Sequence, residues 1–112
     1  MRSILLVASL LIFANPVSAE WGAVGDLNTS KDKDHFYLYL IAVGHGFLWA
    51  NTELTIRKQP NLYCPPEDIS LEFANYLDIL EKELKRNPQS YTPEMPVALP
   101  LLNGLIETFP CK

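Results

Sequence analysis

The sequence predicts a small all-α domain, a single bundle of three to four helices with one disulfide. Three observations support this fold class. The chain has 112 residues and nine prolines, which divide it into segments of helix length. Apolar residues recur at helical spacing within these segments. The two cysteines, Cys64 and Cys111, lie near the two ends of the C-terminal half of the chain.

Residues 1–19 are typical of a secretory signal peptide. Arg2 gives a positive start, and the apolar run Ile4–Phe13 is followed by the small residues of Val17-Ser18-Ala19. This run is about half of the roughly 20 residues that a membrane-spanning helix needs, and an uncleaved signal anchor is the alternative. We therefore expect export through the Sec pathway, a periplasmic location, and one mature domain of residues 20–112 that does not stay in the membrane.

The first long helix is expected at Phe36–Asn51, a run that is apolar almost all round. Glu20–Asn28, with two glycines and no clear period, is expected to be a loose lead-in. Thr29 or Ser30 offers an N-cap. After the helix, Thr52–Tyr63 is polar and ends in turn residues, so its structure is left open between helix and extended chain.

Two glycines leave the continuity of this helix open. Gly44 and Gly46 would each disfavour a helix interior by roughly 1 kcal/mol. They indicate either the close approach of another backbone or a helix that stops near Val43. A strand over Phe36–Val43 is the alternative.

A second helix is predicted after Pro65-Pro66, with Asp68 or Ser70 as its cap. Lysines and an arginine near its end suit the helix dipole, and Asn87-Pro88 stops it. Its apolar stripe consists of Phe73, Leu77, Leu80 and Leu84.

The last helix is predicted to begin between Pro96 and Pro100 and to end before Phe109, because Pro100 would break an established helix. In an oxidising compartment, Cys64 and Cys111 are expected to pair and so to pin the C-terminus to the entry of the preceding helix. The chain-entropy model gives such a loop a stabilisation of about 4 kcal/mol.

The sequence contains no pattern typical of an enzyme. His35 and His45 lack metal-ligand spacing, no nucleophile motif occurs, and the cysteines are expected to be oxidised. Glu81 and Glu83 are expected on the solvated face of their helix. We therefore predict no catalytic residues, no metal site and no cofactor, and the net charge of −4 argues against a nucleic-acid partner.

Surface recognition is the remaining function class. The segment Asn87–Glu94 is a short proline-stiffened turn, and such a turn can present side chains at low entropic cost. Tyr91 and Glu94 are the predicted interface residues, since aromatic side chains are enriched in protein interfaces. The alternative is that Tyr91 packs on its own loop.

The C-terminal half resembles the Rap/Tai family of type VI secretion amidase immunity proteins. The resemblance covers roughly residues 36–111 and is strongest from Cys64. The matching features are Cys64-Pro65-Pro66, a capped helix that ends at Leu84-Lys85-Arg86-Asn87-Pro88, the residues Val97, Leu101 and Leu105, the ending Phe109-Pro110-Cys111, and upstream the segment Tyr39–Gly46.

The chain departs from the family pattern in three places. Two further cysteines that family members often carry are absent, Gly104-Leu105 replaces the usual Ala-Leu pair, and the segment before Phe36 matches poorly. The resemblance implies a periplasmic, mostly helical, often dimeric protein that binds a peptidoglycan amidase and blocks its active site. A small periplasmic acid-stress chaperone, or another periplasmic helical binding protein, is the alternative.

Overall fold

The structure, a computed structural model, describes residues 22–29 and 33–112. The predicted signal peptide and the cap at Ser30 lie outside these residues. The described part is helical, with one isolated antiparallel bridge between Ala23 and Pro96 and no strands, which confirms the predicted all-α class. Its helices are α1 (Asp26–Thr29), α2 (Lys33–Ile56), α3 (Phe73–Arg86) and α4 (Ala98–Thr108).

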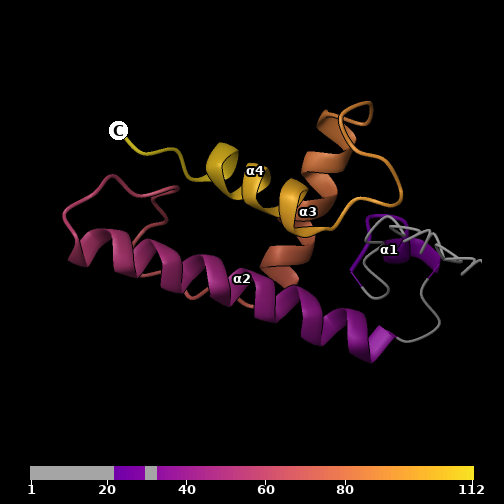
Figure 1. Cartoon of the computed structure of the whole chain (residues 1–112), viewed down its shortest axis with the longest axis horizontal. Coiled ribbons are helices and arrows are strands. Elements are labelled where there is room, and N and C mark those ends of the chain that lie inside the picture. The colour runs from indigo at the N-terminus through magenta and orange to yellow at the C-terminus, as the bar shows by residue number, and fades with distance from the viewer. Residues whose placement is uncertain (1–21, 30–32) are drawn as a thin grey trace, which may run out of the picture.

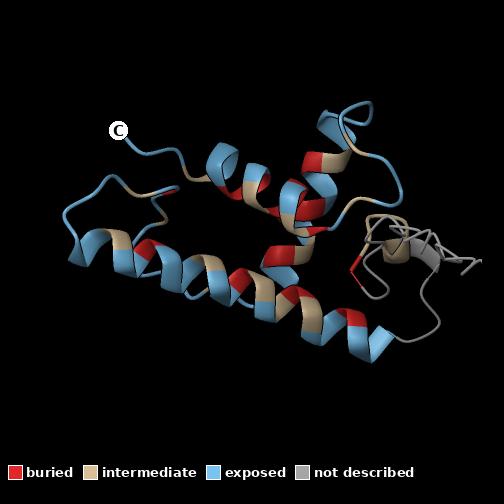
Figure 2. Cartoon of the chain, in the orientation of Figure 1, coloured by how far each residue is buried: buried red, intermediate tan, exposed pale blue. Residues whose placement is uncertain are grey.

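The three longer helices surround one core. Helix α2 is the long base of the molecule, and α3 rises from it toward α4 (Figure 1). Each pair of these helices is in contact, and α3 and α4 make the most extensive contact. Buried positions lie on the face of α2 that is turned toward α3 and α4 (Figure 2). The buried apolar residues are Phe36, Leu40, Tyr63, Tyr76, Ile79, Leu80, Val97, Leu101 and Leu105.

Helix α2 is longer than predicted and unbroken. It runs through both glycines to Ile56, so the strand alternative and the stop near Val43 are wrong. Gly44 permits the close approach that its residue type indicated, although the neighbour is a side chain: a Cβ there would lie 2.5 Å from the Cζ atom of Tyr76. Gly46 has open space around it.

Helix α3 begins at Phe73, three residues after Ser70, the later of the two predicted caps. Its N-cap is Glu72, which forms a reciprocal capping box with Asn75, and the Glu72 N–H donates to the Asn75 side chain at 2.9 Å. The predicted caps Asp68 and Ser70 are therefore wrong. The helix ends at Arg86 as expected.

Helix α4 confirms the predicted boundaries. It starts at Ala98, so that Pro100 lies in the first turn, where a proline removes no helical hydrogen bond. At Gly104 a Cβ would lie 2.8 Å from the Ile79 side chain and 3.0 Å from the Ile79 carbonyl oxygen. The absence of a side chain at Gly104 lets α3 and α4 pack closely.

The lead-in is more ordered than predicted. It contains the short helix α1, which includes Thr29, the other predicted cap. The Val24 and Gly25 N–H groups donate to the carbonyl oxygens of Met95 and Pro93 at 2.8 and 2.9 Å. These bonds attach the lead-in to the turn that precedes α4.

The segment between α2 and α3 is fixed at the far end of α2. The Asn51 side chain is buried; it donates to the Tyr63 carbonyl at 2.7 Å and accepts from the Leu62 N–H at 2.8 Å. The predicted disulfide between Cys64 and Cys111 is present, with Cα atoms 5.0 Å apart. Asn51 fixes the entry to this cross-link, although no pattern in the sequence indicates this role.

Candidate binding surface

The predicted interface turn lies between α3 and α4, and Tyr91 fixes it to both helices. The Tyr91 hydroxyl donates to Glu83 Oε1 at 2.8 Å and accepts from Asn103 Nδ2 at 2.9 Å. Burial and the neighbouring Glu83 carboxylate raise the pKa of Tyr91, which keeps this hydroxyl protonated. Tyr91 is half-buried and packs into the structure, whereas Glu94 is exposed.

The prediction that Glu83 lies on the solvated face of α3 is wrong, because its side chain is buried. It lies one helical turn after Ile79 and Leu80, so it shares their buried face. Asn87 Nδ2 donates to Glu83 Oε1 at 3.0 Å, and Arg86 donates to Oε2 at 3.1 Å. Glu83 thus accepts three side-chain hydrogen bonds, counting the bond from Tyr91.

The electrostatics of Glu83 favour its charged form. Burial alone would raise the pKa of this carboxyl. The hydrogen bonds from Tyr91 and Asn87 and the positive charge of Arg86 outweigh burial, and they hold the pKa below its usual value. Arg86 also lies 3.8 Å from Glu107 of α4. The turn is therefore anchored by a buried anion on α3, and its partners Tyr91 and Arg86 in turn contact Asn103 and Glu107 of α4.

A second surface lies on α2, directly opposite its core face. Trp49 and Ile56 are each 69% exposed and Leu38 is 61% exposed. The core residues Leu40 and Gly44 lie about half a turn away around the helix. The outer face of α2 is therefore a second apolar face, which explains why the sequence appears apolar all round.

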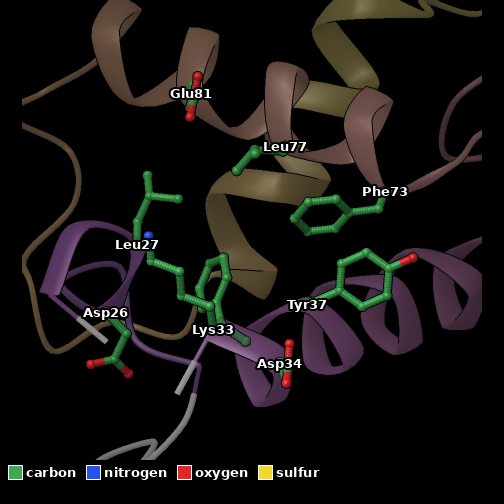
Figure 3. A pocket seen from close by; sticks show the side chains of 9 residues that line it. Asp26, Leu27, Lys33, Asp34, Tyr37, Phe73, Leu77 and Glu81 are labelled. Carbon is green, nitrogen blue, oxygen red and sulfur yellow. The ribbon is translucent and has the colours of Figure 1, made fainter. Parts of the chain in front are cut away.

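Hollows also lie beside α2. The one shown in Figure 3 has a volume of about 470 Å³ and lies between α1, the start of α2 and the side of α3 that carries Phe73, Leu77 and Glu81. Tyr37 and Phe73 form one wall, with ring centroids 4.3 Å apart. Asp34 and Glu81 lie at opposite edges of this hollow (Figure 3).

Neither histidine belongs to a group of three potential metal ligands among the described residues. His45 is exposed in the middle of α2 and approaches the Tyr76 ring edge-on, with ring centroids 6.2 Å apart. His35 is exposed near the start of α2. Among residues 22–29 and 33–112, no group of three potential metal ligands is found, and no helix is long and apolar enough to cross a membrane.

Comparisons with protein-family models, with curated proteins and with solved structures found no match.

Proposed function

We propose that this chain is a periplasmic immunity protein that binds and inhibits a peptidoglycan amidase effector of a type VI secretion system. The motifs of the family resemblance from Cys64 onward lie in one unit of the structure, and the upstream segment Tyr39–Gly46 lies on α2. Cys64 and Cys111 close a covalent loop that contains α3, the turn and α4. An inhibitor of this kind needs a preorganised surface, and the observation that supports the proposal is the turn fixed by Tyr91 and Glu83.

The turn has the properties of an inhibitory loop. Its backbone is held at one side by α3 and α4 and at the other by the lead-in, so it loses little conformational entropy on binding. Glu94 is exposed and offers a carboxylate to a partner. We propose that Glu94 contacts the enzyme directly, and that Tyr91 contributes its accessible ring edge while holding the turn in place.

A rescue experiment tests the proposal. A type VI secretion amidase chosen as the candidate partner is directed to the periplasm of a host cell, with or without this protein. We expect lysis without the protein and normal growth with it. Continued lysis despite verified periplasmic accumulation of the folded protein would refute the immunity function.

Four variants locate the interface. Glu94→Ala should weaken the complex, whereas Glu53→Ala, which removes an exposed carboxylate on α2, should not. Tyr91→Phe retains the ring and removes the hydroxyl that bonds Glu83, so it separates positioning from contact. If neither Glu94→Ala nor Tyr91→Ala changes the dissociation constant measured by calorimetry, the turn is not the interface.

We further propose that the protein forms a homodimer through the outer face of α2. The residues of this face follow one another at alternating steps of four and three; they are Leu38, Ala42, His45, Trp49, Thr52 and Ile56. This is the spacing by which paired helices interlock. We expect Trp49→Ser to convert a dimer to a monomer in sedimentation equilibrium, whereas Leu99→Ser on α4 should not.

An acid-stress chaperone is the second candidate, and the buried Glu83 is the observation that favours it. Protonation of this carboxyl at low pH would weaken the attachment of the turn and loosen α3 from α4. Suppression of client aggregation at about pH 2–3, absent at about pH 7, would favour this function over the immunity function.

A further inference from the structure

Three hollows lie in a row along the crease between α2 and the segment that leads into α3. The first, of about 470 Å³, shares Tyr37 and Phe73 with a second of about 490 Å³. The second shares His45 and Leu71 with a third of about 370 Å³. Because neighbouring hollows share lining residues, they follow one another along this crease, which we call the α2–α3 furrow, and the Tyr37 and Phe73 rings lie at the boundary between the first hollow and the second. The furrow follows α2 from its first turn to Leu48, a length of about 20 Å.

The floor of the furrow is apolar and accessible. Tyr37 is 43% exposed and Leu48 is 40% exposed. The furrow runs beside the outer face of α2 and shares only His45 with it, whereas Tyr37 and Leu48 lie about a third of a turn from Trp49. The apolar side chains that line it are Tyr37, Ile41, Leu48, Leu71, Phe73 and Leu77.

The polar residues along the edges of the furrow, which we call its banks, are mostly acidic. Lys33 is the one lysine or arginine among the described lining residues, and it lies at one end. Among the described exposed acids outside the furrow, Glu53, Asp78 and Glu107 each lie within ion-pair distance of a basic side chain, and Glu94 does not. The acids that line the furrow form no ion pair with another described residue; they are Asp26, Asp34, Glu67, Asp68, Glu72 and Glu81.

We propose that the α2–α3 furrow binds a basic amphipathic segment of a protein partner. Apolar side chains of this segment fill the hollows, and its lysines or arginines face the acidic banks. Charge complementarity selects this occupant, because six carboxylates against one lysine repel anionic lipid surfaces and acidic peptides. The inference goes beyond the proposed function: the furrow lies apart from the Asn87–Glu94 turn, and its chemistry does not require that the partner be an amidase.

A peptide-binding experiment with the purified, disulfide-bonded protein tests the furrow. The probe is a synthetic helical peptide of about 14 residues, which matches the furrow length, with leucine at every third or fourth position and lysine at the others. A leucine–glutamate peptide of the same pattern is the comparison. We expect the lysine peptide to bind at least tenfold more tightly than the glutamate peptide, with affinity falling as salt rises.

Charge variants locate the binding. The triple variant Glu67→Gln, Asp68→Asn and Glu81→Gln should weaken binding of the lysine peptide about tenfold. The matched control Glu53→Gln, Glu94→Gln and Glu107→Gln removes three carboxylates that do not line the furrow and should change the affinity less than threefold. Glu72 is left unchanged because it caps α3. Equal losses in both triple variants would overturn the proposal, since the peptide would then respond only to net charge.

Apolar variants test the floor. Ile41→Ala with Leu48→Ala should weaken the lysine peptide about tenfold, whereas Ile106→Ala with Leu99→Ala, an equivalent pair exposed on α4, should leave it within threefold. Circular dichroism confirms that each variant remains folded. No difference between the two pairs overturns the proposal. Loss of self-association in the furrow variants, with no peptide binding by the parent protein, also overturns it in favour of a second copy as the occupant.

Discussion

At the scale of single residues, the carboxylate of Glu83 connects the core to the turn above it. It is buried and accepts hydrogen bonds from Tyr91, Asn87 and Arg86. A buried charge is tolerated when its partners satisfy its oxygens, and removing that charge leaves the partners without an acceptor of equal strength. Glu83 is therefore a structural residue, and its replacement should weaken the attachment of the turn that forms the proposed interface.

Glu83→Gln should lower the free energy of unfolding by about 1–3 kcal/mol at neutral pH. The folded-state pKa lies below the ordinary value of 4.5, so Glu83 contributes stability above about pH 4.5, and this stability is lost as the pH falls through the folded-state pKa. Urea unfolding across this range should therefore show a flatter acid dependence in the variant. Equal slopes in both proteins would contradict this role.

Two buried tyrosine hydroxyls lack, within the described part of the chain, the hydrogen-bond partners that the Glu83 carboxylate has. The hydroxyls of Tyr63 and Tyr76 are buried and have no hydrogen-bond partner among the described residues. Burial, followed by the proximity of Tyr76, raises the pKa of Tyr63 to about 12. The neutral form of Tyr63 is therefore strongly favoured in the folded state.

Tyr63→Phe should raise the free energy of unfolding by about 0.5–1 kcal/mol at pH 7, because it removes an unsatisfied buried group. In the parent protein, stability should also fall as the pH rises from about 10 to 12, because the unfolded tyrosine ionises first. The variant should lose less stability over this interval. A loss above 1 kcal/mol at pH 7 would show that the hydroxyl has a partner.

At the scale of elements, the two glycines of α2 have opposite environments within one helix. Gly44 lies against the buried ring of Tyr76, and Gly46 faces open space. The first is required by packing between α2 and α3. The second has no contact that requires it, so only its helix propensity matters.

Gly44→Ala should therefore lower the free energy of unfolding by about 1–3 kcal/mol, because the new methyl group would overlap the Tyr76 ring. Gly46→Ala should raise it by about 0.5–1 kcal/mol, because alanine favours the helix. Chemical denaturation of the two variants, each against the parent protein, measures both effects. A stable Gly44→Ala protein would mean that α2 and α3 pack less closely than the structure indicates.

The elements also show what the sequence could predict. Proline positions and apolar spacing located α3 and α4 well, because both signals are local. The buried position of Glu83 was missed because a glutamate looks solvated until the turn that carries Tyr91 folds back over it. Asn51 was missed for the same reason: its partners lie at residues 62 and 63, beyond an intervening turn.

At the scale of the whole molecule, three parts of the chain meet at one node. They are the end of α2, the C-terminus and the segment between α2 and α3 (residues 57–72), which we call the return segment. Asn51 holds the return segment from one side. The disulfide holds it from the other, and the Cys64 N–H donates to the Phe109 carbonyl at 2.7 Å. This node closes the part of the chain that carries the proposed turn.

The double variant Cys64→Ser and Cys111→Ser should lower the free energy of unfolding by about 4 kcal/mol, because the unfolded chain regains the entropy of a 47-residue separation. The contact between α3 and α4 does not depend on the disulfide, so the variant should keep its helical circular dichroism. Native-state hydrogen exchange should show the loss of protection concentrated at the Cys64 amide and at the end of α4. Uniform loss of protection across α2 and α3 would mean that the disulfide supports the whole core; local loss would place it as a clamp on the C-terminal unit.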